Sequence, residues 1–544
     1  MPTLTIDGRT ATVREGATIL DATRALGIEV PTLCWYPKLP TVGSCRICLV
    51  SVAGSPKLLA ACATVATEGM VVNTTSAEAD ANRRTVLSLL LERYPSDELA
   101  ARVYGNGRPP LPDSELTEFE RYVRRYQVPV KPLAAHELPL RHGDERAGDP
   151  MIRHDMSTCI LCTRCVRACE DIQVVGVLDV ERRGEHAAII VGGDGDPDHA
   201  GCTWCGECVR VCPTGAIYEV LPRERFTAAQ VLAPEKVVRS VCPYCGVGCQ
   251  VDLHVRDNTV VRVTSPWIEE DTPNQGSTCV KGRFGYDFTQ HRDRLTRPLI
   301  RKGWVKQGGR WEWKGPTGAG RRGGPWQTIA EEGLAPKPPA PARAVGKRLR
   351  DLPVVERITQ DIRDRATTPP DWYEPFREAD WDEALDLVAH ELRRIHTAYG
   401  APAMAVFQSA KCSNEENYLL QRLFRGAFGT NNVDHCTRLC HSTSVSAMGE
   451  ALATAAASGS MREIEEACDV IFIAGANTTE THPVFGAAIK RAHERGAKLI
   501  VADPRITELA ARADIHLQMQ PGTNVALFNS MLNHILASGL EDRR

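Results

Sequence analysis

The pattern of apolar and polar residues changes several times along the chain of 544 residues. Residues 3–13 alternate between apolar and polar around an Asp-Gly pair, which predicts two strands joined by a tight turn. Helical spacing follows from Thr18 to Leu26, and Gly27 is placed to end that helix. The chain is therefore predicted to begin with a small domain of strands and one helix.

The part of the chain beyond about residue 378 alternates between helical and strand patterns. Three apolar runs, at 403–407, 469–475 and 498–503, have the length and composition of buried parallel strands. The segments between them have helical spacing, so this part is predicted to be a doubly wound α/β domain. Residues 302–375 are instead rich in Gly, Pro, Arg and Trp, which predicts a surface insertion with little core of its own.

Composition narrows the range of functions. A chain of this length predicts about three to five domains. The net charge of −3 gives no reason to expect a nucleic-acid partner. No apolar run reaches the ~18 residues that span a bilayer, and the first residues carry no export signal. We therefore expect the protein in the cytoplasm, where thiols stay reduced.

The most informative residues are the twenty cysteines, sixteen of which fall into four groups of four. Disulfide scaffolds are small and secreted, so a chain of this length does not fit that class. Cysteines grouped in fours at close spacing are typical of iron–sulfur clusters. The chain is therefore predicted to carry electrons.

The first group follows the predicted N-terminal hairpin and helix. Its members are Cys34, Cys45, Cys48 and Cys62. A close Cys-x2-Cys pair with two flanking cysteines is suited to a 2Fe–2S cluster. The arrangement resembles the β-grasp 2Fe–2S ferredoxin domains that begin the electron-input subunits of complex I. A zinc site is the alternative, although the long gap between the first two cysteines is unusual for zinc.

The second and third groups are two copies of the run Cys-x2-Cys-x2-Cys-x3-Cys. This duplicated run is the signature of bacterial two-cluster ferredoxins, in which the fourth cysteine of each run binds the other cluster. One 4Fe–4S cluster is thereby assigned to Cys159, Cys162, Cys165 and Cys212. The second is assigned to Cys202, Cys205, Cys208 and Cys169.

The fourth group consists of Cys242, Cys245, Cys249 and Cys279. The surrounding sequence, VCPYCGVGCQVDLHV and GSTCVKGRFGYDF, closely resembles the first domain of the molybdenum- or tungsten-bis(pyranopterin guanine dinucleotide) oxidoreductases, which binds a 4Fe–4S cluster. In that family a lysine two residues after the last cysteine lies between cluster and pterin, and Lys281 holds that position. Its charge would stabilise the reduced cluster and pterin. Without the motif, Lys281 would be interpreted as a solvated surface residue.

The segment NNVDHCTRLCHSTSV, at 431–445, resembles the formate dehydrogenases. In them a selenocysteine or cysteine coordinates the metal and a histidine follows it. The resemblance makes Cys440 the metal ligand and His441 the proton acceptor. A thiolate is a soft ligand, and an imidazole titrates near neutral pH. Related periplasmic nitrate reductases follow their cysteine with methionine, so the Cys-His pair favours formate as substrate.

The remaining cysteines and two nearby histidines are expected to be structural rather than catalytic. Cys436 is expected to be a small packed residue near the metal. Cys412 and Cys468 are expected to be buried. His435 is expected to have a structural role, and His482 a weak positioning role.

Three loops are predicted to contact the guanine dinucleotide. Ligands of such sheets bind beyond the carboxyl ends of the strands, and the family places these contacts at matching positions. An ordinary strand-end turn is the alternative for each loop taken alone. The residues are Gly475, Asn477, Asp503, Arg505, Gly522, Thr523 and Asn524.

The sequence departs from the family pattern in two places. Many relatives carry a His-x3-Cys-x2-Cys group between the 2Fe–2S and ferredoxin domains. Here the region 79–150 has no cysteine and contains Tyr94, so that cluster is predicted to be absent. The family's catalytic subunits also continue well past the point where this chain stops. The substrate-binding arginine is therefore expected in a missing C-terminal part or on a second polypeptide.

The resemblance implies the catalytic (alpha) subunit of an NAD-dependent formate dehydrogenase, or its N-terminal portion. The implied cofactors are one 2Fe–2S cluster, three 4Fe–4S clusters and a molybdenum or tungsten bis-molybdopterin guanine dinucleotide. The implied partner in a hetero-oligomer is a flavoprotein subunit that binds NAD. One alternative is another molybdopterin oxidoreductase, such as a nitrate reductase. The other is a non-catalytic electron-transfer subunit resembling that of complex I.

These interpretations divide the multidomain α+β and α/β chain into six regions. They are 1–78 (2Fe–2S, β-grasp), 79–150 (connecting region), 151–235 (two-cluster ferredoxin), 236–301 (4Fe–4S domain), 302–375 (insertion) and 376–544 (incomplete molybdopterin-binding α/β domain).

Overall fold

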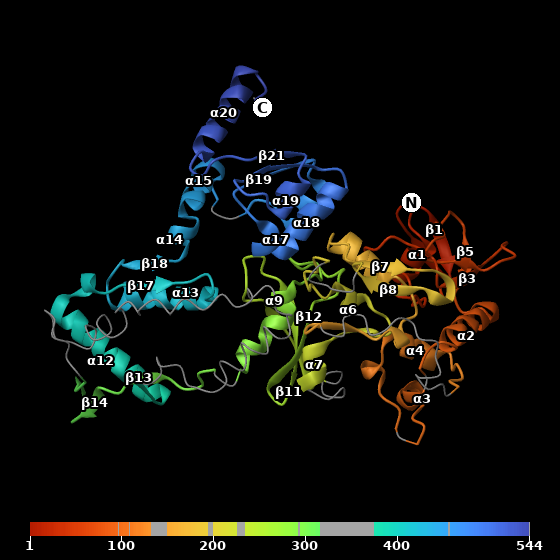
Figure 1. The fold of residues 1–544 in the computed structure, drawn as a ribbon, viewed down its shortest axis with the longest axis horizontal. Coiled ribbons are helices and arrows are strands. Elements are labelled where there is room, and N and C mark those ends of the chain that lie inside the picture. Colours follow the sequence, from red (N-terminus) through yellow and green to blue (C-terminus); the bar gives the residue numbers. More distant parts are fainter. Residues whose placement is uncertain are drawn as a thin grey trace. The chain divides into compact units, whose positions relative to one another are not determined.

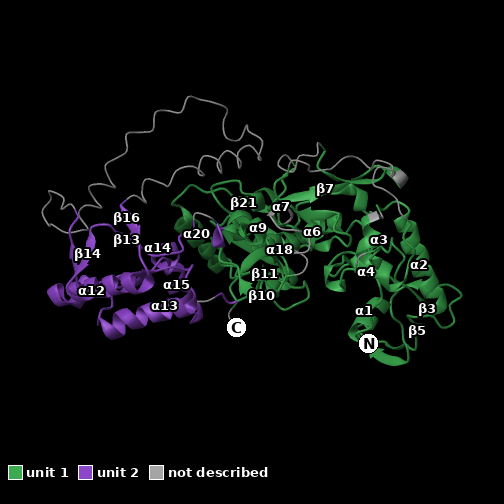
Figure 2. Ribbon diagram, turned by 90° about the horizontal axis from the view of Figure 1, so that it is seen from below, with its two compact units in different colours: residues 1–287, 459–544 green, residues 288–458 purple. Residues whose placement is uncertain are grey.

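The structure is a computed structural model (Figure 1). It describes residues 1–95, 97–107, 109–131, 149–193, 200–225, 234–291, 294–315, 375–454 and 457–542. The chain forms two compact units, one of residues 1–287 with 459–544 and one of residues 288–458 (Figure 2). No helix in the described ranges is long and apolar enough to cross a membrane.

The first unit begins with a five-stranded sheet in the order β2-β1-β5-β3-β4. The elements are β1 (Thr3–Ile6), β2 (Arg9–Thr12), α1 (Ile19–Ala25), β3 (Leu49–Val52), β4 (Leu59–Ala60) and β5 (Val71–Asn73). The predicted hairpin and helix are confirmed. Asp7 and Gly8 turn between the first two strands with φ of 48° and 77°. Thr18 caps α1 by accepting a hydrogen bond from the amide of Asp21.

Three helices follow this sheet and build a core of their own. They are α2 (Ala77–Leu91), α3 (Asp97–Tyr104) and α4 (Glu118–Arg125). Leu87 and Phe119 are fully buried in this core. Tyr94 is buried with them, and its ring lies 5.1 Å from that of Phe119. Residues 132–148 of the predicted connecting region lie outside the described residues.

The two ferredoxin-like cysteine runs lie between paired strands. The elements are β6 (Ile152–His154), α5 (Arg164–Arg167), β7 (Leu178–Glu181), β8 (Ala188–Val191), α6 (Glu207–Val211) and β9 (Ile217–Glu219). The first and last strands pair antiparallel, with Ile152 opposite Glu219. Because the module's ends are joined in this way, the two runs face each other across one apolar core.

A second small sheet carries the fourth cysteine group. It is antiparallel and consists of β10 (Lys236–Val241), β11 (Gln250–Arg256) and β12 (Thr259–Thr264). Helix α9 (Val280–Phe284) begins directly after the last cysteine of the group. Phe284 on this helix is buried in the core of the ferredoxin-like module, which fixes one module against the other.

The last part of the first unit is a parallel sheet in the order β19-β20-β21. Its elements are α16 (Met461–Ala467), β19 (Val470–Ala474), α17 (Thr478–Thr481), α18 (Pro483–Glu494), β20 (Lys498–Ala502), α19 (Glu508–Arg512), β21 (Ile515–Leu517) and α20 (Asn524–Ala537). The second and third predicted strands are confirmed as neighbouring parallel strands. The expected burial of the run 469–475 is wrong for most of its residues. In the described part of the sheet β19 is an edge strand, with Ile473 buried but Val470 58% exposed.

The second unit contains a parallel pair of strands and several helices. These are α12 (Trp381–Tyr399), β17 (Val406–Gln408), α13 (Asn414–Gln421), β18 (Val433–His435), α14 (Thr437–Cys440) and α15 (Ser442–Leu452). The run 403–407 was expected to form a buried strand, but Phe407 is 82% exposed. The reason is that β17 belongs to a sheet of only two strands in the described part of the chain.

Part of the predicted insertion is also described in this unit. It forms a hairpin of β14 (Trp304–Gln307) and β15 (Arg310–Trp313), while β13 (Leu299–Arg301) pairs with β16 (Phe376–Glu378). Trp311 is buried beside Leu387 of α12, and its indole N–H donates to Asp386 at 2.8 Å. Residues 316–374 lie outside the described residues.

Candidate functional site

The first cysteine group lies in the loops next to the N-terminal sheet. Cys34, Cys48 and Cys62 are at most 1% exposed, and Cys45 is half-buried. The sulfur atoms of Cys48 and Cys62 are 3.4 Å apart. A hydrogen bond from the Cys45 thiol lowers the pKa of Cys34, and one from Cys62 lowers the pKa of Cys48. The group therefore consists of two thiol pairs, each of which readily gives up one proton.

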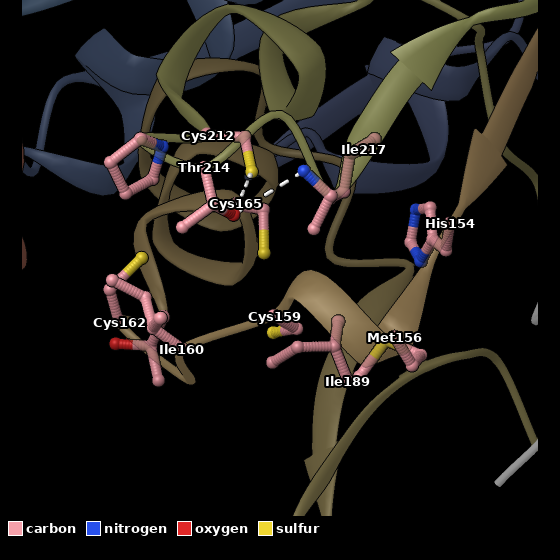
Figure 3. Close-up of a pocket in the computed structure, with 13 residues that line it drawn as sticks. His154, Met156, Cys159, Ile160, Cys162, Cys165, Ile189, Cys212, Thr214 and Ile217 are labelled. Atoms are coloured by element: carbon pink, nitrogen blue, oxygen red, sulfur yellow. Dashed lines mark hydrogen bonds between the residues drawn. The ribbon is translucent and has the colours of Figure 1, made fainter. Parts of the chain in front are cut away.

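The two ferredoxin-like runs exchange their last cysteines in space. One cavity is lined by Cys159, Cys162, Cys165 and Cys212, whose sulfur atoms point toward a common space (Figure 3). A second cavity is lined by Cys169, Cys202, Cys205 and Cys208. Apolar side chains, among them Ile189 in the first and Val177 in the second, complete the walls. The structure thus brings together both predicted sets of four thiols.

The loops around these cavities repeat one backbone conformation. Leu161 and Thr163 in the first run have φ of 54° and 58°, and Trp204 and Gly206 have φ of 47° and 77° at the matching positions of the second. This curled backbone turns main-chain N–H groups toward sulfur. The amide of Leu161 donates to the sulfur of Cys159 at 3.4 Å, and the amide of Trp204 donates to the sulfur of Cys202 at 3.4 Å. Such donors favour a negatively charged thiolate.

The chemistry of these thiols fits a bound iron–sulfur cluster. Burial raises the pKa of Cys162 to about 12. Burial also raises the pKa of Cys165 and of Cys205 well above the usual value of a thiol, helped by the charge of Cys162 in the first case and of Glu207 in the second. Thiols in such surroundings ionise only when a cation compensates their charge. Several iron ions held by four converging thiolates supply that charge. In the described ranges, no three His, Cys, Asp or Glu side chains form a site for a single metal ion.

The fourth cysteine group lines a third cavity. Its cysteines share the walls with Tyr244, Val247, Thr278, Gly282, Pro483 and Val484. The amide of Cys242 donates to the carbonyl of Cys249 at 2.8 Å, which closes the loop between them. Burial raises the pKa of Cys249 to about 12. Lys281 lies on α9 two residues beyond Cys279 and is half-buried.

The start of α18 covers this third cavity. Pro483 and Val484, its first two residues, lie in the cavity wall. His482 precedes them, and its Nε2 atom lies 3.7 Å from the point where a Cβ on Gly246 would stand. The sequence between the second and third cysteines of the group is therefore in contact with the α/β part of the same unit. The positioning role of His482 stays a prediction.

A buried ionic network connects the second ferredoxin-like loop to the domain of the fourth group. Glu219 accepts hydrogen bonds from Arg283 at 2.9 Å and from Arg262 at 2.7 Å. Burial acts to raise the pKa of Glu219, but the charges and hydrogen bonds of the two arginines outweigh it and hold the pKa below its usual value. Arg283 also donates to the carbonyl of Cys205 at 3.2 Å.

Gly206 allows this network to form. A Cβ at this position would lie 2.1 Å from the Cδ atom of Arg283, so only glycine leaves room for the arginine. The matching position of the first run is Thr163, whose hydroxyl accepts a hydrogen bond from Arg167 of the same run at 3.4 Å. The spacing of the cysteines could not identify Arg283 and Arg262 as residues near a cluster. The sequence does not indicate that both arginines pair with Glu219.

The loops predicted to hold a dinucleotide gather at the carboxyl ends of the parallel sheet. The amide of Gly475 donates to the carbonyl of Ala502 at 2.9 Å, which places the loops after β19 and β20 side by side. Asp503 is buried and accepts from the amide of Arg505 at 2.8 Å, while Arg505 itself is exposed. Asn477 is half-buried. The residues Gly522, Thr523 and Asn524 form the start of α20, after β21.

The predicted metal ligand lies in the second unit. Cys440 ends α14, and His441 has φ −152° and ψ 26°, which separates this helix from α15. Both side chains are exposed. The thiol of Cys436 accepts from the amide of Ala410 at 3.3 Å, and His435 is held by Thr437 at 2.7 Å. The roles of Cys440 as metal ligand and of His441 as proton acceptor stay predictions.

Two expectations about other cysteines need correction. Cys412 and Cys468 were expected to be buried, but both are half-exposed. Cys468 ends α16 at the surface, where its carbonyl accepts a hydrogen bond from Arg495 at 2.8 Å. Cys412 lies in a turn before α13. Cys436 is exposed, although it was expected to be packed.

Comparison with known proteins assigns each part of the chain. Family models match in succession: the 2Fe-2S iron-sulfur cluster binding domain over residues 1–77, the ferredoxin-like domain of NADH-quinone oxidoreductase subunit 3 over 149–218, the molybdopterin oxidoreductase Fe4S4 domain over 235–291, and molybdopterin oxidoreductase over 294–544. The fold and its thiol-lined cavities define a multidomain iron–sulfur oxidoreductase. The chain belongs to the molybdopterin oxidoreductase family.

Three relatives illustrate this kinship. The provisionally named oxidoreductase YjgC of Bacillus subtilis is 30% identical over 580 residues, which cover 100% of this chain and 50% of that protein. The alpha subunit of the NADPH-Fe(3+) oxidoreductase of Geobacter sulfurreducens is 30% identical over 554 residues, 100% of this chain and 53% of its own. A Staphylococcus haemolyticus protein with a provisional formate dehydrogenase name is 28% identical over 578 residues, 99% of this chain and 50% of its own. The chain spans about half the length of the curated relatives it matches.

Proposed function

We propose that this chain is the catalytic (alpha) subunit, or part of it, of a formate dehydrogenase. The observation that carries the proposal is the exposed Cys440-His441 pair at the break between α14 and α15, in a chain of the molybdopterin oxidoreductase family. The relative from Staphylococcus haemolyticus, whose provisional name is formate dehydrogenase, gives further support. Formate oxidation releases CO2, one proton and two electrons.

Different residues of the chain would hold the metal, take up the proton and bind the dinucleotide. A molybdenum or tungsten bis-molybdopterin guanine dinucleotide, when bound, accepts the two electrons. The thiolate of Cys440 would hold the metal, because a soft sulfur ligand suits it. The imidazole of His441 would take up the proton, because a neutral imidazole can act as a general base. The loops at Gly475, Asp503 and Gly522 would bind the dinucleotide.

The cysteine groups extend the proposal to electron transfer. We assign one 2Fe–2S and three 4Fe–4S clusters to the four groups, since each 4Fe–4S group lines one cavity with four thiols. Lys281, close behind the fourth group, would stabilise the reduced cofactors by its charge. A flavoprotein subunit that binds NAD would receive the electrons, in a hetero-oligomer in the cytoplasm.

Metal content and formate turnover test the proposal together. Chain purified without oxygen should contain about 14 irons and about one molybdenum or tungsten. Formate-dependent reduction of a dye should be lost in Cys440→Ser and should fall by about 100-fold in His441→Gln. The variant Cys436→Ser is the matched control and should keep its activity. Unchanged turnover in Cys440→Ser would contradict the assignment.

A second candidate function follows from the Geobacter relative, whose name describes an NADPH-Fe(3+) oxidoreductase subunit alpha. In that case the chain would pass electrons from a pyridine nucleotide to an acceptor without oxidising formate. Full iron content with no molybdenum or tungsten, and reduction of the clusters by NADPH in a complex with a flavoprotein, would favour this candidate over the first.

A further inference from the structure

Arg167 lies at the junction of the first two cysteine groups. It belongs to α5, between the third and fourth cysteines of the first ferredoxin-like run, and it is 8% exposed. Its Nη2 atom donates to the carbonyl of Cys34 at 2.5 Å and to the carbonyl of Cys162 at 3.3 Å. Its Nη1 atom donates to the carbonyl of Pro40 at 2.7 Å. One nitrogen atom thus connects a cysteine of the 2Fe–2S group with a cysteine of the first 4Fe–4S group.

The duplicated run provides an internal comparison. Arg210 occupies the matching position in the second run, but it forms an ion pair with Glu207 of its own helix. The position of Glu207 is held by Arg164 in the first run, and Arg164 donates to the carbonyl of Thr32 at 3.1 Å. In the first run both arginines therefore reach the loop of the N-terminal domain. Arg210 meets the same loop differently, over the ring of Tyr36 at 5.8 Å from its centroid, so the repeat folds alike without a guanidinium hydrogen bond to a cysteine carbonyl of the 2Fe–2S group.

The charge of Arg167 is not cancelled by its hydrogen-bond partners. Its acceptors are three carbonyl groups and the hydroxyl of Thr163, none of which carries a net charge. A guanidinium is planar and presents its donors in a fixed fork, so it holds its acceptors at defined separations. A lysine has the same charge but a single flexible ammonium, and it cannot reproduce that fork.

We propose that Arg167 is a positioning residue that fixes the 2Fe–2S site against the first 4Fe–4S site, so that the two exchange electrons directly. The proposal rests on the cluster assignment of the proposed function, but not on formate as the substrate. Two separate effects follow from it. The fork sets the distance between the two clusters. The charge of Arg167, which Asp171 offsets only through space and none of its hydrogen-bond acceptors neutralises, favours the reduced, more negative form of each.

The test uses the full chain, purified without oxygen, with iron content and electron paramagnetic resonance as readouts. In the unmodified chain, reduction of the cluster whose signal is lost in Cys159→Ser should speed the relaxation of the 2Fe–2S signal. In Arg167→Lys, iron content and reduction potentials should stay unchanged, while this interaction weakens and electron exchange between the two clusters slows by about tenfold. In Arg167→Met, the reduced-to-oxidised ratio of both clusters at a fixed potential should fall about tenfold, which is about 59 mV for a one-electron couple.

Arg210→Lys is the matched control, because it changes the equivalent arginine of the other run. It should leave the interaction between the 2Fe–2S cluster and the first 4Fe–4S cluster as it is. The proposal is overturned if Arg167→Lys keeps the full interaction, or if Arg210→Lys weakens it equally. Absence of any interaction in the unmodified chain overturns it without the use of a variant. An inactive chain in the formate assay leaves each of these readouts intact, so the two proposals fail separately.

Discussion

Replacing Glu219 with glutamine should loosen the contact between the ferredoxin-like module and the domain of the fourth cysteine group. The carboxylate accepts from Arg283 at 2.9 Å and from Arg262 at 2.7 Å. The side chain of Arg283 is 1% exposed and cannot turn to water, whereas that of Arg262 is 26% exposed and can. The substitution therefore leaves the buried Arg283 without its hydrogen-bonded counter-charge, and Glu207 acts on it only through space.

The expected cost follows from this difference between the two arginines. Leaving one charge of a buried pair without its partner costs about 3–5 kcal/mol. The carbonyl oxygen of the new glutamine still accepts one hydrogen bond, which offsets about 1 kcal/mol of this loss. The net loss of local stability is about 2–4 kcal/mol, which corresponds to hydrogen exchange about 30- to 700-fold faster.

Hydrogen exchange is the suitable assay, because a chain of several domains does not unfold in one step. Amides of β9 and β12 should exchange faster in Glu219→Gln than in the unmodified chain. Glu270→Gln is the matched control, since Glu270 is paired at 2.9 Å with Arg239 on the surface. It should leave exchange unchanged. Equal exchange in Glu219→Gln and the unmodified chain, or an equal effect of Glu270→Gln, would refute the reasoning.

The same network predicts a dependence on pH. The pKa of Glu219 is lower in the folded chain than its usual value of about 4.3. The stability it contributes is therefore complete above that usual value and is lost as the pH falls through the lower, folded value. The difference in local stability between the unmodified chain and Glu219→Gln should thus be constant near neutral pH and shrink only below about pH 4. A difference that already shrinks near pH 6 would contradict this assignment.

Three further predictions concern the thiols and one glycine. Cys212→Ser should remove the spectroscopic signal of the first ferredoxin-like cluster and Cys169→Ser that of the second, each with a loss of about four irons per chain; the opposite result would contradict the exchange of cysteines between runs. Gly206→Ala should cost about 1–3 kcal/mol, measured by hydrogen exchange of α9, because its methyl group would overlap Arg283. Cys440→Ser should keep its full iron content while losing molybdenum or tungsten, and retention of the metal would argue against that thiol as its ligand.

Local signals explain what the sequence could predict of the fold. The first hairpin and helix depend on residues close in sequence, a turn at Asp7-Gly8 and a cap at Thr18, and both lie where they were predicted. Burial was harder to predict, because it depends on what covers a strand. The runs 403–407 and 470–474 are apolar throughout, yet in the described part of the chain each forms a strand at the edge of its small sheet and exposes large side chains.

The candidate sites, too, could be predicted only where the signal lies close together in the sequence. The cysteines of the ferredoxin-like runs could be sorted into two sets, because their spacing limits how four thiols can meet in one cavity. Arg167 and Arg283 could not be identified, because both act on main-chain carbonyls contributed by distant parts of the chain. No side-chain pattern marks such acceptors. The role of these arginines becomes visible only when the modules are placed side by side within the first unit.

The left-handed loops around the ferredoxin-like cavities have a consequence for the biogenesis of the protein. Leu161, Thr163 and Trp204 all carry a Cβ atom, so each left-handed backbone costs on the order of 1 kcal/mol. In the proposed function, the clusters hold these loops in place. A newly synthesised chain would carry this strain uncompensated until iron and sulfide are inserted, and its module would open more often. Before cluster insertion, the loops would therefore be sensitive to proteolysis. After insertion, they would resist it.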